Sequence, residues 1–148
     1  MARDFAGKTV VITGAGGGLG RALALRFAAA GARIVALDRD AAVLQGLTFP
    51  EGTAVLRLGC DVTREEDCVH AMAEARRAFG GIDVLINNAG ITHRSAFADT
   101  RTEVIRRVME VNYFGALHCT HAALGDLELF LVSIGPDSEG MRYEAVFT

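Results

Sequence analysis

One stretch near the amino end decides the fold of this chain: Thr9-Val-Val-Ile-Thr13-Gly14-Ala-Gly-Gly-Gly18-Leu19-Gly20. Its first five residues form a short β-branched run, which is typical of a buried strand. The glycines lead into a segment rich in Ala and Leu, 19–30, which predicts a helix that ends at Gly31. The stretch therefore predicts a strand, a glycine loop and a helix in succession.

Strand and helix signals keep alternating beyond this first unit. Further strands are predicted at 33–37, 53–58 and 82–86. Thr63 with Glu66, and Thr100 with Glu103, match the capping-box pattern and predict two more helices, the second running through Gly115. Strands that alternate with helices pair in parallel and need helices on both faces. We expect an α/β fold with a doubly wound parallel sheet.

The pattern changes after Leu124. Strands are predicted at 126–134 and 141–147, joined by the turn sequence 135–140 with its Gly-Pro beginning. This tail also resembles the closing hairpin of a small β-rich domain of unknown function. We therefore divide the chain into an α/β domain, 1–124, and a divergent tail, 125–148, expected to form a β-hairpin.

Bulk properties exclude several classes of function. The chain has 148 residues, a formal net charge of -3 and scattered basic residues, which argues against nucleic acid or an anionic membrane surface as a partner. Arginines interrupt its most apolar stretch, so no membrane span is predicted. Its three cysteines, Cys60, Cys68 and Cys119, form no Cys-x-x-Cys pair, which favours a reduced, cytoplasmic protein.

The glycine loop has the chemistry to bind a dinucleotide pyrophosphate. Phosphates need backbone amides at close range and the positive end of a helix dipole, and glycines allow both. The spacing Gly14-x-x-x-Gly18-x-Gly20 departs from the usual Gly-x-Gly-x-x-Gly fingerprint. The alternative is a helix-entry loop that binds no ligand.

Polar residues follow the next three predicted strands, at the edge where open α/β sheets bind ligands. Asp38 can accept hydrogen bonds from adenosine ribose hydroxyls and would repel a 2′-phosphate, which favours NAD over NADP, although Arg39 favours the opposite. Asp38 could instead cap a helix near Asp40. Asp61-Val62 and Asn87-Asn88-Ala89-Gly90 could likewise be ordinary turn residues.

Asn112 follows Ile105 and Val108 at helical spacing, so we expect it on a buried face, where its amide needs hydrogen-bond partners. A functional role and a structural bridge would each explain it.

His118 and His121 lie one turn apart with Cys119 between them, but no carboxylate or second cysteine completes a set of ligands. We expect no metal site.

Five motifs, taken in their order along the chain, resemble the signature of the short-chain dehydrogenase/reductase family. They are Thr13-Gly-x-x-x-Gly-x-Gly, Asp38, Asp61-Val62, Asn87-Asn-Ala-Gly90 and Val111-Asn112. The resemblance covers roughly residues 6–124 and implies a Rossmann-type fold that binds NAD, or less readily NADP. It implies catalytic Asn112 and the following cofactor-binding residues: Thr13, Gly14, Gly18, Leu19 and Gly20 at the pyrophosphate, Asp38 at the ribose, Asp61 and Val62 at the adenine, and Asn88, Ala89 and Gly90 beside the cofactor.

The resemblance stops before the family's catalytic Tyr-x-x-x-Lys. Four residues after Tyr113 and Tyr143 stand Leu117 and Phe147, and the single lysine, Lys8, precedes the first strand. Ser133 follows an apolar run as the family's serine does, but the sequence around it departs from the family's pattern.

We therefore expect an oxidoreductase by ancestry that is truncated and catalytically incomplete, with a small alcohol or carbonyl as substrate if active. A homo-oligomer is one arrangement that the sequence leaves open. The alternatives are a non-catalytic nucleotide-binding or interaction module and a defective product.

Overall fold

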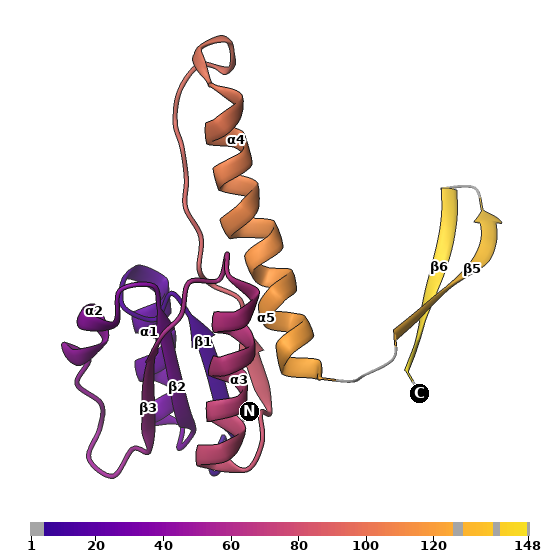
Figure 1. Cartoon of the computed structure of the whole chain (residues 1–148). Coiled ribbons are helices and arrows are strands. Elements are labelled where there is room, and N and C mark those ends of the chain that lie inside the picture. The colour runs from indigo at the N-terminus through magenta and orange to yellow at the C-terminus, as the bar shows by residue number, and fades with distance from the viewer. Residues whose placement is uncertain (1–4, 126–128, 138–139, 148) are drawn as a thin grey trace.

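A four-stranded parallel sheet forms the centre of the molecule (Figure 1). The computed structural model describes residues 5–125, 129–137 and 140–147. Strands β1 (Thr9–Thr13), β2 (Arg33–Asp38), β3 (Val55–Gly59) and β4 (Val84–Ile86) lie in the order β3-β2-β1-β4. All pairs are parallel, and β1 pairs with β2 from Thr9↔Arg33 to Thr13↔Leu37. The predicted α/β fold with a doubly wound parallel sheet is confirmed.

Helices cover both faces of the sheet, because apolar side chains alternate between the faces along each strand. On one face, Ile12 and Ile34 belong to a buried cluster with α1 (Gly18–Ala29) and α2 (Ala41–Gln45). On the other face, the buried cluster joins Val11, Val35 and Leu37 to α3 (Glu65–Phe79) and α5 (Gly115–Leu124). This two-sided burial leaves the carboxyl ends of the strands as the edge available to a ligand.

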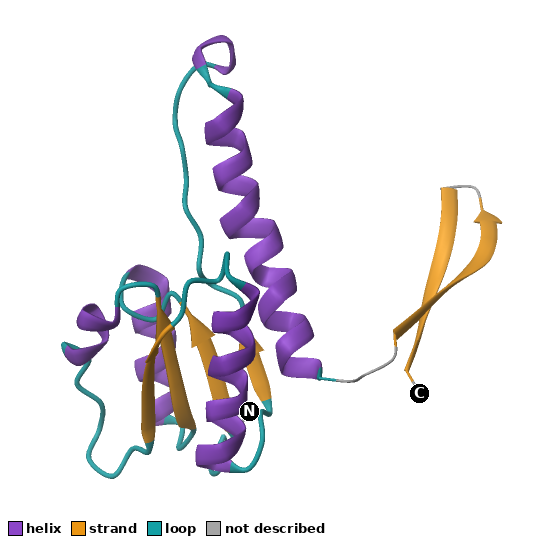
Figure 2. Cartoon of the chain, in the orientation of Figure 1, coloured by secondary structure: helices purple, strands orange, loops and turns teal. Residues whose placement is uncertain are grey.

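A long continuous helix follows β4 (Figure 2). It consists of α4 (Thr102–Met109), a π-helical turn at Glu110–Phe114, and α5. The connection from β4 contains a short 3-10 turn, Phe97–Asp99, and runs beside α4 (Figure 2). A Cβ atom at Gly115 would lie 2.5 Å from Cγ2 of Val62, so glycine lets α5 pack directly against the segment that follows β3.

Both predicted capping boxes are wrong. Helix α3 begins at Glu65, and the Thr63 hydroxyl donates to Oδ1 of Asp61 at 2.7 Å. Helix α4 begins at Thr102, and the Thr100 hydroxyl donates to the Ala96 carbonyl at 2.9 Å. Each hydroxyl has found a partner upstream of the helix, and these local bonds replace the expected caps.

The tail contains the predicted antiparallel pair, β5 (Leu129–Asp137) and β6 (Gly140–Phe147). Pairing runs from Leu129↔Phe147 to Asp137↔Gly140, with a register shift between Ser133 and Gly135. The predicted turn begins too early, because residues 135–137 belong to β5. The start of the predicted first strand, 126–128, and positions 138–139 lie outside the described residues.

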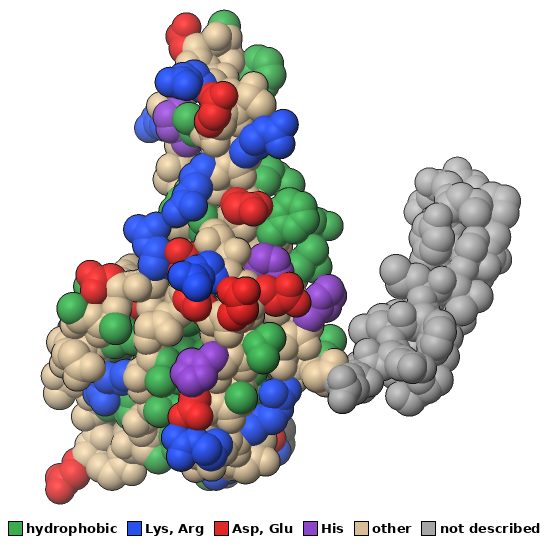
Figure 3. Space-filling model, viewed as in Figure 1, with side chains coloured by type: hydrophobic (Ala, Val, Ile, Leu, Met, Phe, Trp, Pro, Cys, Tyr) green, Lys and Arg blue, Asp and Glu red, His purple; other side chains and the backbone are tan. Residues whose placement is uncertain are grey.

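Apolar side chains gather on the outer surface of the long helix (Figure 3). The exposed ones are Ile105, Met109, Tyr113, Phe114 and Leu117. Within the described ranges, no helix is long and apolar enough to span a membrane.

Candidate functional site

The loops after the four parallel strands surround a cavity of about 410 Å³ at the carboxyl edge of the sheet. Its lining includes eight residues that the sequence singled out: Gly14, Leu19, Asp38, Asp61, Val62, Asn88, Ala89 and Gly90. Thr13, Gly18, Gly20 and Asn112 are outside this lining. The cavity also includes five residues that the sequence motifs did not predict as site residues: Gly17, Arg39, Cys60, Ile91 and Val111.

The glycine loop is shaped by close packing against the loop that follows β4. Gly14 has a φ of +64°, and a Cβ there would lie 3.0 Å from the Ala89 Cα. A Cβ at Gly20 would lie 2.1 Å from the Gly14 carbonyl oxygen. These glycines bring the amino end of α1, which has no acidic residue in its first turn, close to the cavity. A helix amino end carries a partial positive charge, so the loop suits an anion.

Thr13 and Asn88 fasten the two loops together. The Thr13 hydroxyl accepts hydrogen bonds from the backbone amides of Asn88 and Ala89, at 3.0 and 2.9 Å. The Asn88 side-chain amide donates to the carbonyls of Thr13 and Gly14, at 2.9 and 3.2 Å. Since Thr13 is buried and bonded in this way, its role in the structure is to position the glycine loop.

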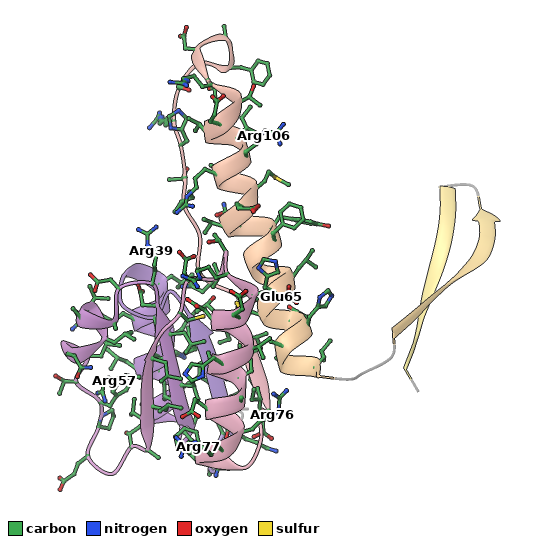
Figure 4. The ribbon with its side chains drawn as sticks, in the orientation of Figure 1. Arg39, Arg57, Glu65, Arg76, Arg77 and Arg106 are labelled. Carbon is green, nitrogen blue, oxygen red and sulfur yellow. The ribbon has the colours of Figure 1, made fainter. Side chains whose placement is uncertain are left out.

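Asp38 holds the glycine loop from the other side. Its Oδ2 accepts a hydrogen bond from the Gly16 amide at 3.0 Å, and its Oδ1 accepts one from the Asp40 amide at 3.1 Å. Asp40 is the N-cap of α2, so the alternative role of Asp38 as that cap is wrong. Arg39 projects beyond the carboxyl edge of the sheet (Figure 4) and lines the same cavity.

Asp61 forms a tight turn with Thr63 at the wall of the cavity. Its Oδ1 accepts hydrogen bonds from the Thr63 amide and hydroxyl, at 3.0 and 2.7 Å. Partial burial acts to raise the pKa of Asp61, but the Thr63 hydrogen bonds and the positive charges of Arg107 and Arg39 lower it below 3.8 overall. The turn role that the sequence left open is therefore real, and the ionised carboxylate also faces the cavity.

The lowered pKa of Asp61 predicts a pH-dependent contribution to stability. A carboxyl whose pKa falls on folding stabilises the protein above its unfolded pKa of 3.8, and this contribution is lost as the pH falls through the lower folded pKa. We expect Asp61→Asn to lower the free energy of unfolding at pH 7 and to flatten its decline below pH 3.8. Urea titrations across this range, with exposed Asp99→Asn as control, measure the effect. Parallel stability curves for Asp61→Asn and the unmodified chain would contradict the assignment.

Asn112 is exposed, so the predicted burial of its face is wrong. Its Nδ2 donates to the Ile91 carbonyl at 2.9 Å, and its Oδ1 accepts from the Ile91 amide at 2.8 Å. These bonds fix Ile91, which lines the cavity, to the π-helical turn. The structural bridge that the sequence left open is therefore present, and π-turns often occur at functional sites.

The residues that sequence reasoning missed come from two sources. Cys60 and Ile91 each adjoin a motif, Asp61-Val62 and Asn87–Gly90, so neighbourhood alone could have suggested them. Val111 reaches the cavity from the π-turn, and it stands in the motif Val111-Asn112, in which only Asn112 was given a role. Lys8 lies at the opposite edge of the sheet, where its Nζ pairs with Oδ1 of Asp83 at 2.9 Å.

The side chains of the described part of the chain include no group of three His, Cys, Asp or Glu placed to hold a metal ion. The His118 ring instead contacts the Val62 carbonyl through Nδ1 at 2.9 Å.

The cavity combines a glycine cradle at a helix amino end, two carboxylates and an apolar wall. This combination can hold a phosphate-bearing ligand with a hydroxylated, partly apolar end.

Known proteins match both parts of the chain. The family model described as short chain dehydrogenase matches residues 8–129, and a domain of unknown function (DUF6916) matches residues 114–147. The bovine dehydrogenase/reductase SDR family member 7B is 46% identical over 125 residues, which cover 78% of this chain and 38% of that protein. Bovine L-fucose dehydrogenase is 36% identical, over 86% of this chain and 47% of that protein.

Solved structures agree with these matches. A 3-ketoacyl-(acyl-carrier-protein) reductase from Brucella melitensis, complexed with NADH, superposes with a TM-score of 0.75 and 37% identity, over 79% of this chain and 49% of that one. This chain therefore spans half or less of the length of these relatives. Because the family model matches more than half of its residues, the chain belongs to the short-chain dehydrogenase family.

Proposed function

We propose that the cavity binds NAD(H). The pyrophosphate would lie at the glycine loop and the amino end of α1, with the adenosine ribose at Asp38 and the adenine beside Asp61 and Val62. The observation that carries this proposal is the cradle itself: a Cβ atom at Gly14 would meet the backbone of Ala89 in the neighbouring loop, and one at Gly20 would meet the Gly14 carbonyl. Family membership supports it, since a relative of similar fold is complexed with NADH.

NAD(H) is preferred over NADP(H) because Asp38 supplies a carboxylate at the end of β2, where a 2′-phosphate would be repelled. Arg39 acts against this preference from the same wall of the cavity, since its guanidinium suits a phosphate. Asp38 is also held in place by the Gly16 and Asp40 amides, which gives the carboxylate a fixed position. Calorimetric titration with each dinucleotide tests the proposal, and tighter binding of NADP would overturn the preference.

Replacement of Asp38 gives a sharper test. We expect Asp38→Ala to weaken NAD binding by roughly 10- to 100-fold, since hydrogen bonds to a charged group contribute about 1.5–3 kcal/mol. The affinity gap between NAD and NADP should narrow. Asp40→Ala is the matched control, because it removes a nearby carboxylate that caps α2 but is not part of the cavity lining. Equal effects of the two substitutions on NAD affinity would contradict a ribose contact by Asp38.

We further propose that the cofactor-binding unit serves hydride transfer between nicotinamide and a small alcohol or carbonyl compound. The names of the relatives, a fucose dehydrogenase and a ketoacyl reductase among them, support this reaction class. Bound NAD(H) would accept or supply the hydride. The chain's own residues would bind and orient the cofactor, and Asn112 would fix the Ile91 segment beside it. The 148 residues include no Tyr-x-x-x-Lys pair, so we propose no proton-transfer group within them.

A further inference from the structure

Three cysteines from distant parts of the sequence meet in the core below the cavity. Cys60 follows β3, Cys68 lies in the first turns of α3, and Cys119 lies in α5. All three are buried. The Cys119 Sγ donates to the Cys68 Sγ across 3.5 Å, and Cys60 belongs to the same buried cluster. An S–S bond is about 2.05 Å long, so the sulfurs of Cys68 and Cys119 need to approach by roughly 1.5 Å.

The packing of α3 against α5 holds this pair in place independently of the sulfurs. Arg76 reaches from α3 to the carboxyl end of α5 (Figure 4), where its guanidinium donates to the carbonyls of Ala122 and Ala123 at 2.9 and 2.8 Å. Both cysteines belong to the same apolar cluster as Ala71, Met72 and Ala75 of α3. A bond between the two sulfurs would therefore join helices that are already in contact.

The neighbouring thiols of this cluster act on the pKa of Cys68. Hydrogen bonds from the Cys119 and Cys60 sulfhydryls lower the pKa of Cys68, and the nearby His118 acts in the same direction, against the effect of burial. The same cluster raises the pKa of Cys60, through its hydrogen bonds to Cys119 and Cys68 and through burial. The thiolate is the reactive form of cysteine, so Cys68 would be the attacking group and Cys119 the resolving one.

We propose that Cys68 and Cys119 form a reversible redox pair, which a small hydroperoxide converts into a disulfide between α3 and α5. In the first step, the Cys68 sulfur attacks one peroxide oxygen, the O–O bond breaks, and Cys68 becomes a sulfenic acid as hydroxide leaves. In the second step, the Cys119 sulfur attacks the Cys68 sulfur, the S–O bond breaks, and water leaves. Together, two thiols lose two electrons and two protons, and hydrogen peroxide is reduced to two water molecules.

The pair is placed to control the cavity, and this part of the inference rests on the proposed cofactor binding. Cys60, 3% exposed, lines the cavity above the pair. The Val62 carbonyl accepts from the Cys68 Sγ at 3.7 Å and contacts His118 of α5, so Val62 touches both helices that the disulfide would join. Drawing the two sulfurs together would displace Val62 from its position at the cavity. We therefore expect the oxidised chain to bind NAD at least about fivefold more weakly, the lower end of typical coupling between sites.

The experiment is a disulfide map of the full chain. The protein is treated with hydrogen peroxide, its free thiols are blocked with iodoacetamide, and it is digested with trypsin without reduction. The three cysteines fall on separate fragments, 58–64, 65–76 and 108–142. We expect mass spectrometry to find fragment 65–76 linked to fragment 108–142, and a dithiol reductant to reverse the link. Three free thiols, irreversible oxidation alone, or a link that includes fragment 58–64 would overturn the proposal.

Variants and cofactor titrations complete the test. Cys60→Ser should keep the link, whereas Cys119→Ser and Cys119→Ala should each lose it while retaining the circular dichroism spectrum of the folded chain.

NAD is then titrated into reduced, oxidised and re-reduced protein. If reduced protein binds no NAD, the proposed function fails while the disulfide map still decides the redox pair. Equal NAD affinity before and after formation of the mapped disulfide would overturn the control of the cavity.

Discussion

The purified 148-residue chain is expected to show no turnover of simple alcohols with NAD, or of aldehydes and ketones with NADH. General acid–base catalysis contributes about 10²–10⁴-fold to such reactions and needs a group that titrates near the working pH. Lys8 is the only lysine, and it pairs with Asp83 at the edge of the sheet opposite the cavity. Tyr113 is exposed on the π-turn, and the residue four positions later is Leu117. The Asn112 amide does not titrate near neutral pH, so it cannot serve as the acid or the base.

A screen followed at the nicotinamide absorbance tests this expectation, with a full-length dehydrogenase of the family as the positive control. NAD titration of the same preparation separates two causes of inactivity: a chain that binds NAD without turnover lacks the proton-transfer group, and a chain that binds none lacks the site. Robust turnover that disappears in Asn112→Ala or Tyr143→Phe would prove the expectation wrong. It would show that the tail rebuilds a proton-transfer group.

Local patterns predicted the fold well because the deciding signals are local. The run Thr9–Thr13 followed by glycines and an Ala-rich segment specifies a strand, a loop and a helix without reference to the rest of the chain. The Asp61 and Asn87–Gly90 motifs could also be placed at one edge, because parallel strands bring their carboxyl ends together. The sequence could therefore predict most of the cavity wall from topology and motif position.

Features that depend on tertiary partners escaped prediction. The capping boxes failed because the hydroxyls of Thr63 and Thr100 bonded to Asp61 and Ala96, a choice that sequence spacing does not reveal. The predicted buried face of the long helix assumed 3.6 residues per turn, whereas the π-turn at Glu110–Phe114 contains more residues per turn and rotates the helix beyond it. Asn112 lies within this turn and is bonded to Ile91. The predicted face is already exposed at Ile105, upstream of the turn, because α4 extends beyond the sheet (Figure 1) and none of its residues is buried.

The cysteine cluster shows the same limit. Cys68 and Cys119 are 51 positions apart and lie on different helices, so their contact exists only once α3 and α5 have packed on the sheet. In the sequence, the three cysteines form no Cys-x-x-Cys pair, and this absence indicated only a reduced protein. Their spacing gave no sign that helix packing brings the sulfurs together.

Gly18→Val is expected to abolish detectable NAD binding while the chain remains folded. Gly18 is the first residue of α1, and among the described residues no atom lies within 4 Å of a Cβ built there, so the added side chain would point into open space at the glycine loop. Its neighbours Gly17 and Leu19 line the cavity, so this space adjoins the place that we propose for the pyrophosphate. Loss of two hydrogen bonds to a charged group would cost about 3 kcal/mol or more, which is roughly 100-fold in affinity.

Backbone strain is the competing explanation, and the chain offers a matched control for it. Gly18 and Gly52 have φ values of +51° and +81°, a region that a β-branched residue adopts at a cost of about 1–2 kcal/mol. A Cβ at Gly52 likewise meets no described atom within 4 Å, and Gly52 precedes β3, at the edge of the sheet opposite the cavity. Gly18→Val and Gly52→Val should therefore lose similar stability in thermal unfolding, but only Gly18→Val should lose NAD in calorimetric titration. The two variants share the backbone strain, but only Gly18→Val would obstruct a ligand at the glycine loop. Unchanged NAD affinity in Gly18→Val would therefore show that the pyrophosphate does not lie on this loop.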